Sequence, residues 1–305
     1  MKCISVLLML SLMGCALKPT RSTEKSPRIF KFVDQELPVA MKSIPLDQAS
    51  VILDARAPFE YSLAHIPNSI NLQWDEFSEQ GTAYKGKLLT DLFSISTRLA
   101  RIGIGPDSKV LVVGMGIKGN GEEGRLAWML NYLGVKQVSM IDISSLKARM
   151  INTTQEQNKS ATIWKPKVLD AILCASKEFL FAINQQALTN SVSYEGLPAR
   201  LYKIIDVRTE AEYLGRQTLD EEAIVTPDVG AINIEWKQFF DKQGLPRKGI
   251  KKQIIEIGVK PENRILVIDS KGVRSAAATM ALLSLGFSHA ANCAAGWREV
   301  IDRRE

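Results

Sequence analysis

A short loop in the second half of the chain carries the residues best placed to do chemistry. It follows an apolar segment at 265–268 and precedes a predicted amphipathic helix at 275–285, which stops before Gly286. The backbone N–H groups of such a loop, with the positive end of the helix, form a cradle that stabilises an anion or a thiolate. The loop residues are Asp269, Ser270, Lys271, Gly272, Val273 and Arg274.

A second polar group follows a short apolar segment at 204–205. It consists of Asp206, Arg208 and Glu212. Two carboxyl groups close to a guanidinium have the composition of an acid-base cluster, in which one carboxyl gives up a proton and the other takes one. We therefore treat these residues as candidates for the same site as the loop.

The chain has four cysteines, and their spacing fits no metal site. Cys3 would leave with an amino-terminal leader and Cys15 would carry a lipid, so only Cys174 and Cys293 remain as candidate thiols. These two could form a disulfide in an oxidising compartment, or they could stay as two buried free thiols. Both alternatives are open at the level of the sequence.

The amino terminus has the pattern of an export leader. Residues 1–14 combine Lys2 with an apolar run at 4–13 that is too short to span a bilayer, as in a secretion signal. The run ends in Leu12, Met13, Gly14 and Cys15, which resembles a bacterial lipobox. We expect a lipid on Cys15 that anchors the protein to a membrane facing the periplasm, and Ala16 resembles an outer-membrane sorting signal. The alternative is an ordinary signal peptide with an incidental cysteine.

The same order of elements occurs twice along the chain, and this repeat organises the fold. Each copy has apolar strands, a glycine-containing loop, and a helix that stops at a glycine. The predicted strands lie at 51–53, 110–113, 138–141, 204–205, 265–268 and around 289–292, and the predicted helices at 125–133 and 275–285. This alternation predicts two α/β domains, each a small parallel sheet flanked by helices on both faces.

Composition places the boundaries between these units. The segment after the leader is rich in Lys, Arg, Ser, Thr and Pro, which is typical of a flexible tether, and the segment between the copies is polar. We expect a leader at 1–14, a lipid-anchored tether at 15–30, a first domain at 31–150, a linker at 151–165 and a second domain at 166–305.

Both copies share a more specific pattern after their first strand. The first copy has Asp54, Ala55, Arg56, Glu60, Tyr61, His65, Ile66, Pro67, Ile70 and Asn71. The second has Asp206, Val207, Arg208, Glu212, Tyr213, Ala231, Ile232 and Asn233. This pattern resembles the rhodanese family, and its duplication resembles the tandem thiosulfate and 3-mercaptopyruvate sulfurtransferases.

The resemblance implies a role for the loop in the second copy. In the family the working loop runs cysteine, two residues, glycine, one residue, arginine, so Gly272 and Arg274 place the cysteine position on Asp269. A carboxylate cannot form the persulfide that carries sulfur in these enzymes, and the first copy also lacks a cysteine after its strand. The resemblance further implies that Asp206, Arg208 and Glu212 brace the loop rather than form an acid-base cluster.

Three further sequence features, the net charge, a glycine-rich stretch and the two histidines, do not indicate a functional site. Lys+Arg 39 against Asp+Glu 33 gives a net charge of +6, but the basic residues are scattered, so we expect no nucleic-acid partner. Gly114, Gly116 and Gly119 match a dinucleotide-binding spacing, but we expect the following helix to start too late to meet a pyrophosphate. His65 and His289 have no acid and nucleophile nearby in the sequence. We expect no cofactor and no metal.

The sequence thus favours a catalytically silent rhodanese scaffold that works as a binding or interaction module. Its partner would be an unidentified protein or small anion. The enzyme alternative is thiosulfate or 3-mercaptopyruvate sulfur transfer despite the substitution, or through Cys293, which should lie at the same edge of the sheet as the loop. The expected location is the cell envelope.

Overall fold

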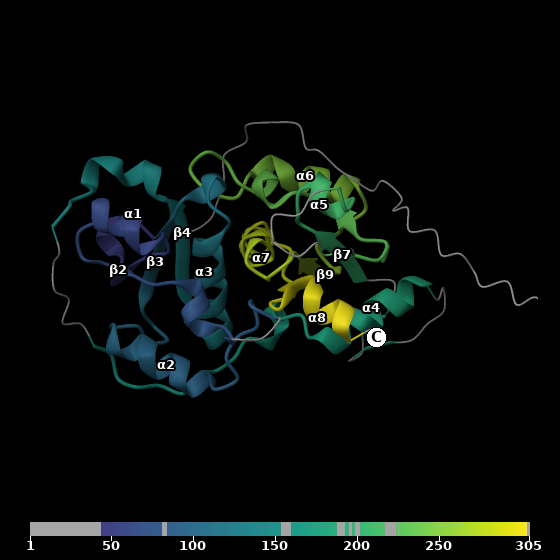
Figure 1. The fold of residues 1–305 in the computed structure, drawn as a ribbon, viewed down its shortest axis with the longest axis horizontal. Helices are drawn as coiled ribbons and strands as arrows, with labels where there is room; N and C mark the ends of the chain where they lie inside the picture. Colours follow the sequence, from purple (N-terminus) through teal and green to yellow (C-terminus); the bar gives the residue numbers. More distant parts are fainter. Residues whose placement is uncertain are drawn as a thin grey trace, which may run out of the picture.

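The structure is a computed structural model that describes residues 44–80, 84–153, 160–187, 193–194, 197–198, 202–216, 224 and 226–303. The described residues form two α/β units with the same topology (Figure 1). The predicted leader, Cys15 and the tether at 15–30 lie outside these residues, as does 154–159 of the predicted linker.

The first unit contains a four-stranded parallel sheet in the order β2-β1-β3-β4. Alternate strand residues face opposite sides, so Leu53 and Val112 pack under the helices α2 and α3, whereas Ile52 packs with Ile66 on the other face. The elements are β1 (Val51–Asp54), α1 (Pro58–Leu63), β2 (Ser69–Asn71), α2 (Leu92–Arg101), β3 (Lys109–Gly114), α3 (Glu122–Leu133) and β4 (Gln137–Asp142).

The second unit repeats this order as β10-β9-β7-β8, again parallel. Residues of α6 and α7 pack on one face, and residues of α4 and α8 pack on the other. The elements are α4 (Ser176–Ala187), the hairpin β5 (Ser193–Tyr194) and β6 (Leu197–Pro198), β7 (Tyr202–Asp206), α5 (Glu210–Tyr213), β8 (Ile232–Asn233), α6 (Lys248–Glu256), β9 (Arg264–Ile268), α7 (Arg274–Ser284), β10 (Ala290–Asn292) and α8 (Gly296–Asp302). The predicted fold class is confirmed.

Short 3-10 helices join these elements. They are η1 (Leu46–Gln48), η2 (Trp74–Phe77), η3 (Gly116–Lys118), η4 (Ile143–Arg149), η5 (Asp170–Ile172) and η7 (Trp236–Phe239). Within the described part of the chain, no helix is both long enough and apolar enough to cross a membrane.

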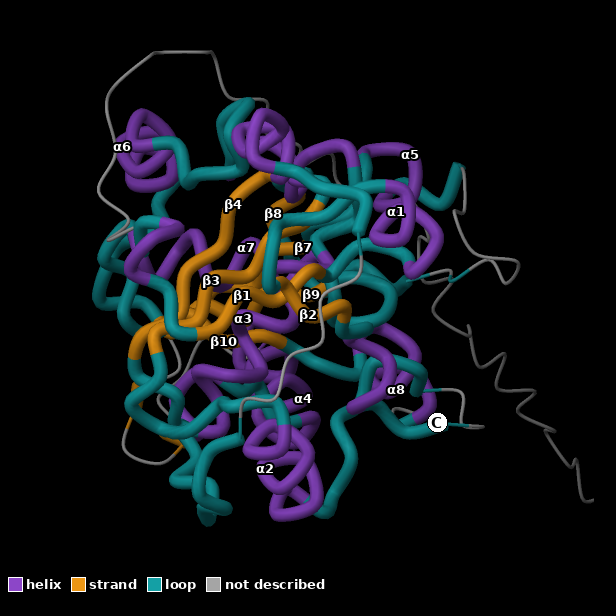
Figure 2. The backbone as a smooth tube through the Cα atoms, turned by 90° about the vertical axis from the view of Figure 1, so that its left-hand side faces the viewer, coloured by secondary structure: helices purple, strands orange, loops and turns teal. Residues whose placement is uncertain are grey.

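The two units meet where α3 packs against α7, near the centre of Figures 1 and 2. Gly124 on α3 allows the close approach, since a Cβ atom there would lie 2.4 Å from the Cβ of Ala277 on α7. One continuous hydrophobic core therefore includes residues of both units. The helix that follows the candidate loop is thus also the main contact with the first domain.

One helix begins earlier than the sequence predicts. α3 starts at Glu122 rather than at 125, directly after Gly121, which adopts the left-handed conformation with φ 86°. Glu122 and Glu123 occupy its first turn, where negative side chains interact favourably with the helix dipole. The glycine-rich stretch before α3 is correspondingly shorter than expected.

Candidate functional site

The loop after β9 surrounds the carboxylate of Asp269 with hydrogen-bond donors. Asp269 Oδ1 accepts hydrogen bonds from the backbone N–H of Gly272 at 2.6 Å and from the hydroxyl of Ser275 at 2.8 Å. Oδ2 accepts from the backbone N–H of Arg274 at 3.3 Å and from its Nε at 3.4 Å. Asp269 is only 2% exposed. Both carboxylate oxygens therefore have donors from the loop and from the first turn of α7.

The sharp turn in this loop depends on Gly272. Its φ of 75° lies in the left-handed region, which glycine adopts without a steric penalty. A Cβ atom at Gly272 would also lie 1.9 Å from the carbonyl oxygen of Ala294. The loop is therefore packed tightly against the segment between β10 and α8. In this conformation the N–H of Gly272 points toward Asp269 and donates a hydrogen bond to it.

Arg274 and Glu212 form a buried, two-point ion pair beside the loop. Arg274 Nη1 lies 2.8 Å from Glu212 Oε2, and Nη2 lies 2.9 Å from Oε1. Thr209 orients the carboxylate, because its N–H and hydroxyl donate to Oε2 at 3.0 and 2.8 Å. Burial alone would raise the pKa of Glu212, but the hydrogen bonds and charge of Arg274 lower it overall. The pKa of Arg274 is correspondingly raised against the opposing effect of burial.

Asp206 and Arg208 form a second buried pair that reaches the loop through Trp297. Arg208 Nη2 lies 2.7 Å from Asp206 Oδ2, which also accepts the indole N–H of Trp297 at 3.0 Å. The backbone N–H of Trp297 in turn donates to the carbonyl of Asp269 at 2.9 Å. The structure thus brings all three residues of the second polar group into contact with the loop or with its immediate neighbours.

Arg125 of the first domain contacts the loop directly. Its Nη1 donates to the carbonyl of Gly272 at 3.2 Å, its Nη2 donates to the carbonyl of Gly86, and its guanidinium lies 4.8 Å from the ring centroid of Trp128. Burial lowers the pKa of Arg125 to about 9, and the negative charge of Asp269 opposes this shift. This role of Arg125 was not predicted from the sequence.

Gly86 also covers the loop directly. A Cβ atom on Gly86 would lie 1.5 Å from the carbonyl oxygen of Lys271 and 2.5 Å from that of Ala294. Backbone of the first domain is therefore in direct contact with backbone of the loop. Only tertiary packing reveals this contact, because 185 positions separate residue 86 from residue 271 along the sequence.

The position in the first domain that corresponds to Asp269 is occupied by a glycine. Asp54 pairs with Val113 in one sheet and Asp206 pairs with Ile268 in the other, so Gly114 corresponds to Asp269. The carboxyl of Glu123 fills this place, since a Cβ atom on Gly114 would lie 2.3 Å from its Oε2. Glu123 is 5% exposed, and its Oε2 has no hydrogen-bond partner within the part of the chain that the structure describes. Burial raises the pKa of Glu123 to about 8.

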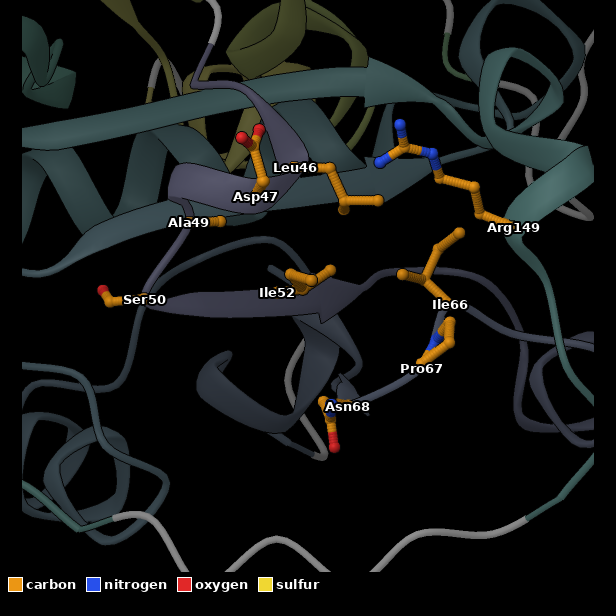
Figure 3. A pocket seen from close by; sticks show the side chains of 9 residues that line it. All are labelled: Leu46, Asp47, Ala49, Ser50, Ile52, Ile66, Pro67, Asn68 and Arg149. Atoms are coloured by element: carbon orange, nitrogen blue, oxygen red, sulfur yellow. The ribbon is translucent and has the colours of Figure 1, made fainter.

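Among the described residues of the first domain lie two surface pockets that were not predicted from the sequence. One, of about 300 Å³, lies at the edge of the sheet where β1 and β3 end, between Arg56, Met115 and Asp142. Among the described residues, neither of its two lysines, Lys118 and Lys147, has an ion-pair partner. The other pocket, of about 310 Å³, is lined by residues around Ile52 and is shown in Figure 3. Neither pocket is lined by the 269–274 loop.

The remaining candidates form no catalytic group with the loop. Cys174 and Cys293 are buried free thiols, and burial raises the pKa of Cys293. His65 stacks on Tyr61 with ring centroids 4.2 Å apart, and His289 is exposed. Within the described residues, no group of His, Cys, Asp and Glu side chains could hold a metal ion.

Comparison with known proteins identifies the family of both domains. A rhodanese-like domain model matches residues 39–145 and 192–302. No curated protein matches the sequence. The structure is similar to that of SseA from Escherichia coli, described among 3-mercaptopyruvate sulfotransferases, with 19% identity, a TM-score of 0.63, and coverage of 81% of this chain and 92% of that one.

A second similar structure is the anaerobic ergothioneine biosynthesis enzyme from Chlorobium limicola. Its identity to this chain is 16% and the TM-score is 0.68, with coverage of 86% of this chain and 65% of that one. At these identities the likeness to both solved structures establishes the fold alone.

Proposed function

The chain belongs to the rhodanese-like domain family, and from this premise we propose that it is a catalytically silent tandem-domain protein that works as a binding or interaction module. The proposal includes the assignment of Asp269 to the position that a cysteine occupies in sulfur-transferring members. It also includes a lipid on Cys15 that would hold the protein in the cell envelope.

The hydrogen bonding of Asp269 carries the proposal. Sulfur transfer needs a thiolate that attacks the donor sulfur and holds it as a persulfide, and a carboxylate has no sulfur to do so. The Asp269 carboxylate accepts four hydrogen bonds from Gly272, Arg274 and Ser275. The two short bonds, from Gly272 and Ser275, are of the charge-assisted kind that contributes about 1.5 to 3 kcal/mol each, so an incoming anion would have to displace a well-bound group.

Burial of Cys293 argues against the enzyme alternative through this thiol. The side chain of Cys293 packs in the second-domain core with Trp297, on the face of the sheet that α4 and α8 cover. Because burial raises the pKa of this thiol, the thiolate that would act as a nucleophile is scarce near neutral pH. We therefore expect no sulfur transfer through Cys293, and the assay described below tests this expectation.

Two features of the first domain support a partner other than a sulfur donor. The pocket lined by Lys118 and Lys147 has an apolar wall that includes Leu63. Its lining also includes Arg56 and the two carboxylates of Glu60 and Asp142, so basic side chains outnumber acidic ones by three to two, which suits a small organic anion. Phe59 and Leu63 on α1 are 71% and 60% exposed, and exposed apolar side chains of this size suit contact with a protein.

The decisive experiment is a sulfur-transfer assay with thiosulfate and with 3-mercaptopyruvate as donors and cyanide as the acceptor. The wild-type chain should show no turnover above the buffer rate, and Asp269→Cys should gain measurable turnover because the loop amides and Arg274 remain in place. Asp269→Ser is the matched control and should stay inactive, since it removes the carboxylate without supplying sulfur. Wild-type turnover that is lost in Cys293→Ser would instead establish the enzyme alternative.

The envelope location has its own test. Expression in a bacterium fed a labelled fatty acid should label the wild-type chain, and Cys15→Ala should abolish both the label and the membrane association. A labelled Cys15→Ala variant, or an unlabelled wild-type chain, would contradict lipid attachment at this residue.

A further inference from the structure

Cys174 and Cys293 lie side by side although they are far apart in the sequence. Leu173 and Asn292 form an isolated parallel bridge, and the backbone N–H of Cys174 donates to the carbonyl of Asn292 at 3.0 Å. The residues after this bridge are Cys174 and Cys293, and both side chains enter the same hydrophobic cluster. Neighbouring strands are about 4.8 Å apart, which is within the range of Cα separations that a disulfide spans.

The two thiols affect each other electrostatically. Burial is the largest cause of the raised pKa of Cys293, and the neighbouring Cys174 thiol raises it further. The groups around the pair are the Glu178–Arg264 ion pair, with Nε and Oε1 2.7 Å apart, and the carbonyl of Ala175, 3.8 Å from the Cys174 sulfur. The carboxylate of Glu178 raises the pKa of Cys293 and the guanidinium of Arg264 lowers it, so these two charges oppose one another.

We propose that Cys174 and Cys293 form an intramolecular disulfide when the chain meets a disulfide donor. The thiolate of one cysteine attacks the donor disulfide, which forms a mixed disulfide and releases the first donor thiolate. The second cysteine then attacks the mixed disulfide and releases the other donor thiol. The protein loses two electrons and two thiol protons, and the donor is reduced to two thiols. Because both thiols are buried in the folded chain, this exchange proceeds most readily during folding.

The bond would fix the turn that supports the candidate loop. The carbonyl of Cys293 accepts the N–H of Gly296 at 2.9 Å, and the next residue, Trp297, donates its N–H to the carbonyl of Asp269 at 2.9 Å. Cys174 lies before α4, on the second-domain side of the linker. A disulfide would therefore attach the start of the second domain to the turn that supports the loop. This inference does not depend on whether the loop is catalytically silent.

The test uses the full chain with Cys3→Ser and Cys15→Ser, so that only the two thiols of the pair remain. The protein is unfolded, refolded in a mixture of reduced and oxidised glutathione, quenched with acid and alkylated in denaturant. We expect an intact mass two hydrogens lighter than that of the reduced chain, no alkylation, and one cross-linked peptide that contains both cysteines. The oxidised form should melt about 5 to 10 °C above the reduced form, because the crosslink restricts the unfolded chain.

Single-cysteine variants provide the matched controls. Cys174→Ser and Cys293→Ser in the same background should each keep one alkylatable thiol or carry one glutathione, and should melt at the same temperature with and without a reductant. Two alkylatable thiols, two glutathione adducts, or a covalent dimer after oxidative refolding of the two-thiol chain would overturn the proposal. The mass readout decides the question even if a serine variant folds poorly.

Discussion

The guanidinium of Arg125, on α3 of the first domain, donates a hydrogen bond to the carbonyl of Gly272 in the second-domain loop at 3.2 Å. The N–H of the same Gly272 donates to Asp269 at 2.6 Å. The backbone of one residue, Gly272, thus links a buried cation of one domain to the buried carboxylate of the other. The conformation of the loop therefore depends on both domains, although its sequence belongs to the second.

Replacing Arg125 with lysine should loosen the loop. A lysine ammonium is a compact charge that cannot reach the carbonyls of Gly272 and Gly86 together or stack on Trp128 as a planar guanidinium does. We expect Arg125→Lys to lower the free energy of unfolding by about 1 to 2 kcal/mol and to speed amide hydrogen exchange at Gly272. Arg101→Lys on the exposed side of α2 is the control and should change neither quantity.

Removing the charge of Glu212 should lower the free energy of unfolding by an amount that depends on pH. The pKa of Glu212 is lowered in the folded state, so its ion pair with Arg274 stabilises the fold above the ordinary value of 4.5. This contribution is lost as the pH falls through the lowered value. Glu212→Gln should therefore be less stable than wild type by about 3 kcal/mol at pH 7, and the gap should close in acid. Urea unfolding between pH 3 and pH 8 measures this, and a gap that stays constant would contradict it.

Glu123 should give the opposite pH dependence. Its pKa is raised to about 8, so the folded state holds a proton that the unfolded state gives up above the ordinary value of 4.5. The fold should therefore lose about 4 kcal/mol of stability as the pH rises from 5 to 9. Glu123→Gln keeps the shape without the titration, so its stability should vary less over this range. Glu256→Gln, at an exposed site, should behave like wild type.

An alanine at Gly86 should disturb the contact between the first domain and the loop. The added Cβ would overlap the carbonyl oxygen of Lys271, and neither backbone can move without breaking its packing. We expect Gly86→Ala to lower the free energy of unfolding by about 2 kcal/mol or more. Gly105→Ala is a matched control, because the nearest atom to its Cβ, on Ala161, is 3.9 Å away. Equal melting temperatures for the two variants would refute this account of the contact.

The order of elements was available from the sequence because it depends on local patterns. Short apolar segments predicted β1, β3, β7 and β9, and the glycines at 134 and 286 predicted where α3 and α7 stop. Alternation of these strands with helices was enough to predict two parallel sheets, and the repeated Asp and Arg pairs indicated the family. The position of Asp269 between strand and helix followed from the same reasoning.

The contacts that define the candidate site came only from the tertiary structure. Packing of α3 on α7 places Arg125 against Gly272, and the bridge between Leu173 and Asn292 places Cys174 beside Cys293. The raised pKa of Glu123 also depends on burial among residues distant in the sequence. Sequence periodicity reports which face of an element is apolar, but it carries no information on which elements meet or at what distance. These relationships depend on how side-chain volumes fit, as Gly124 against Ala277 illustrates.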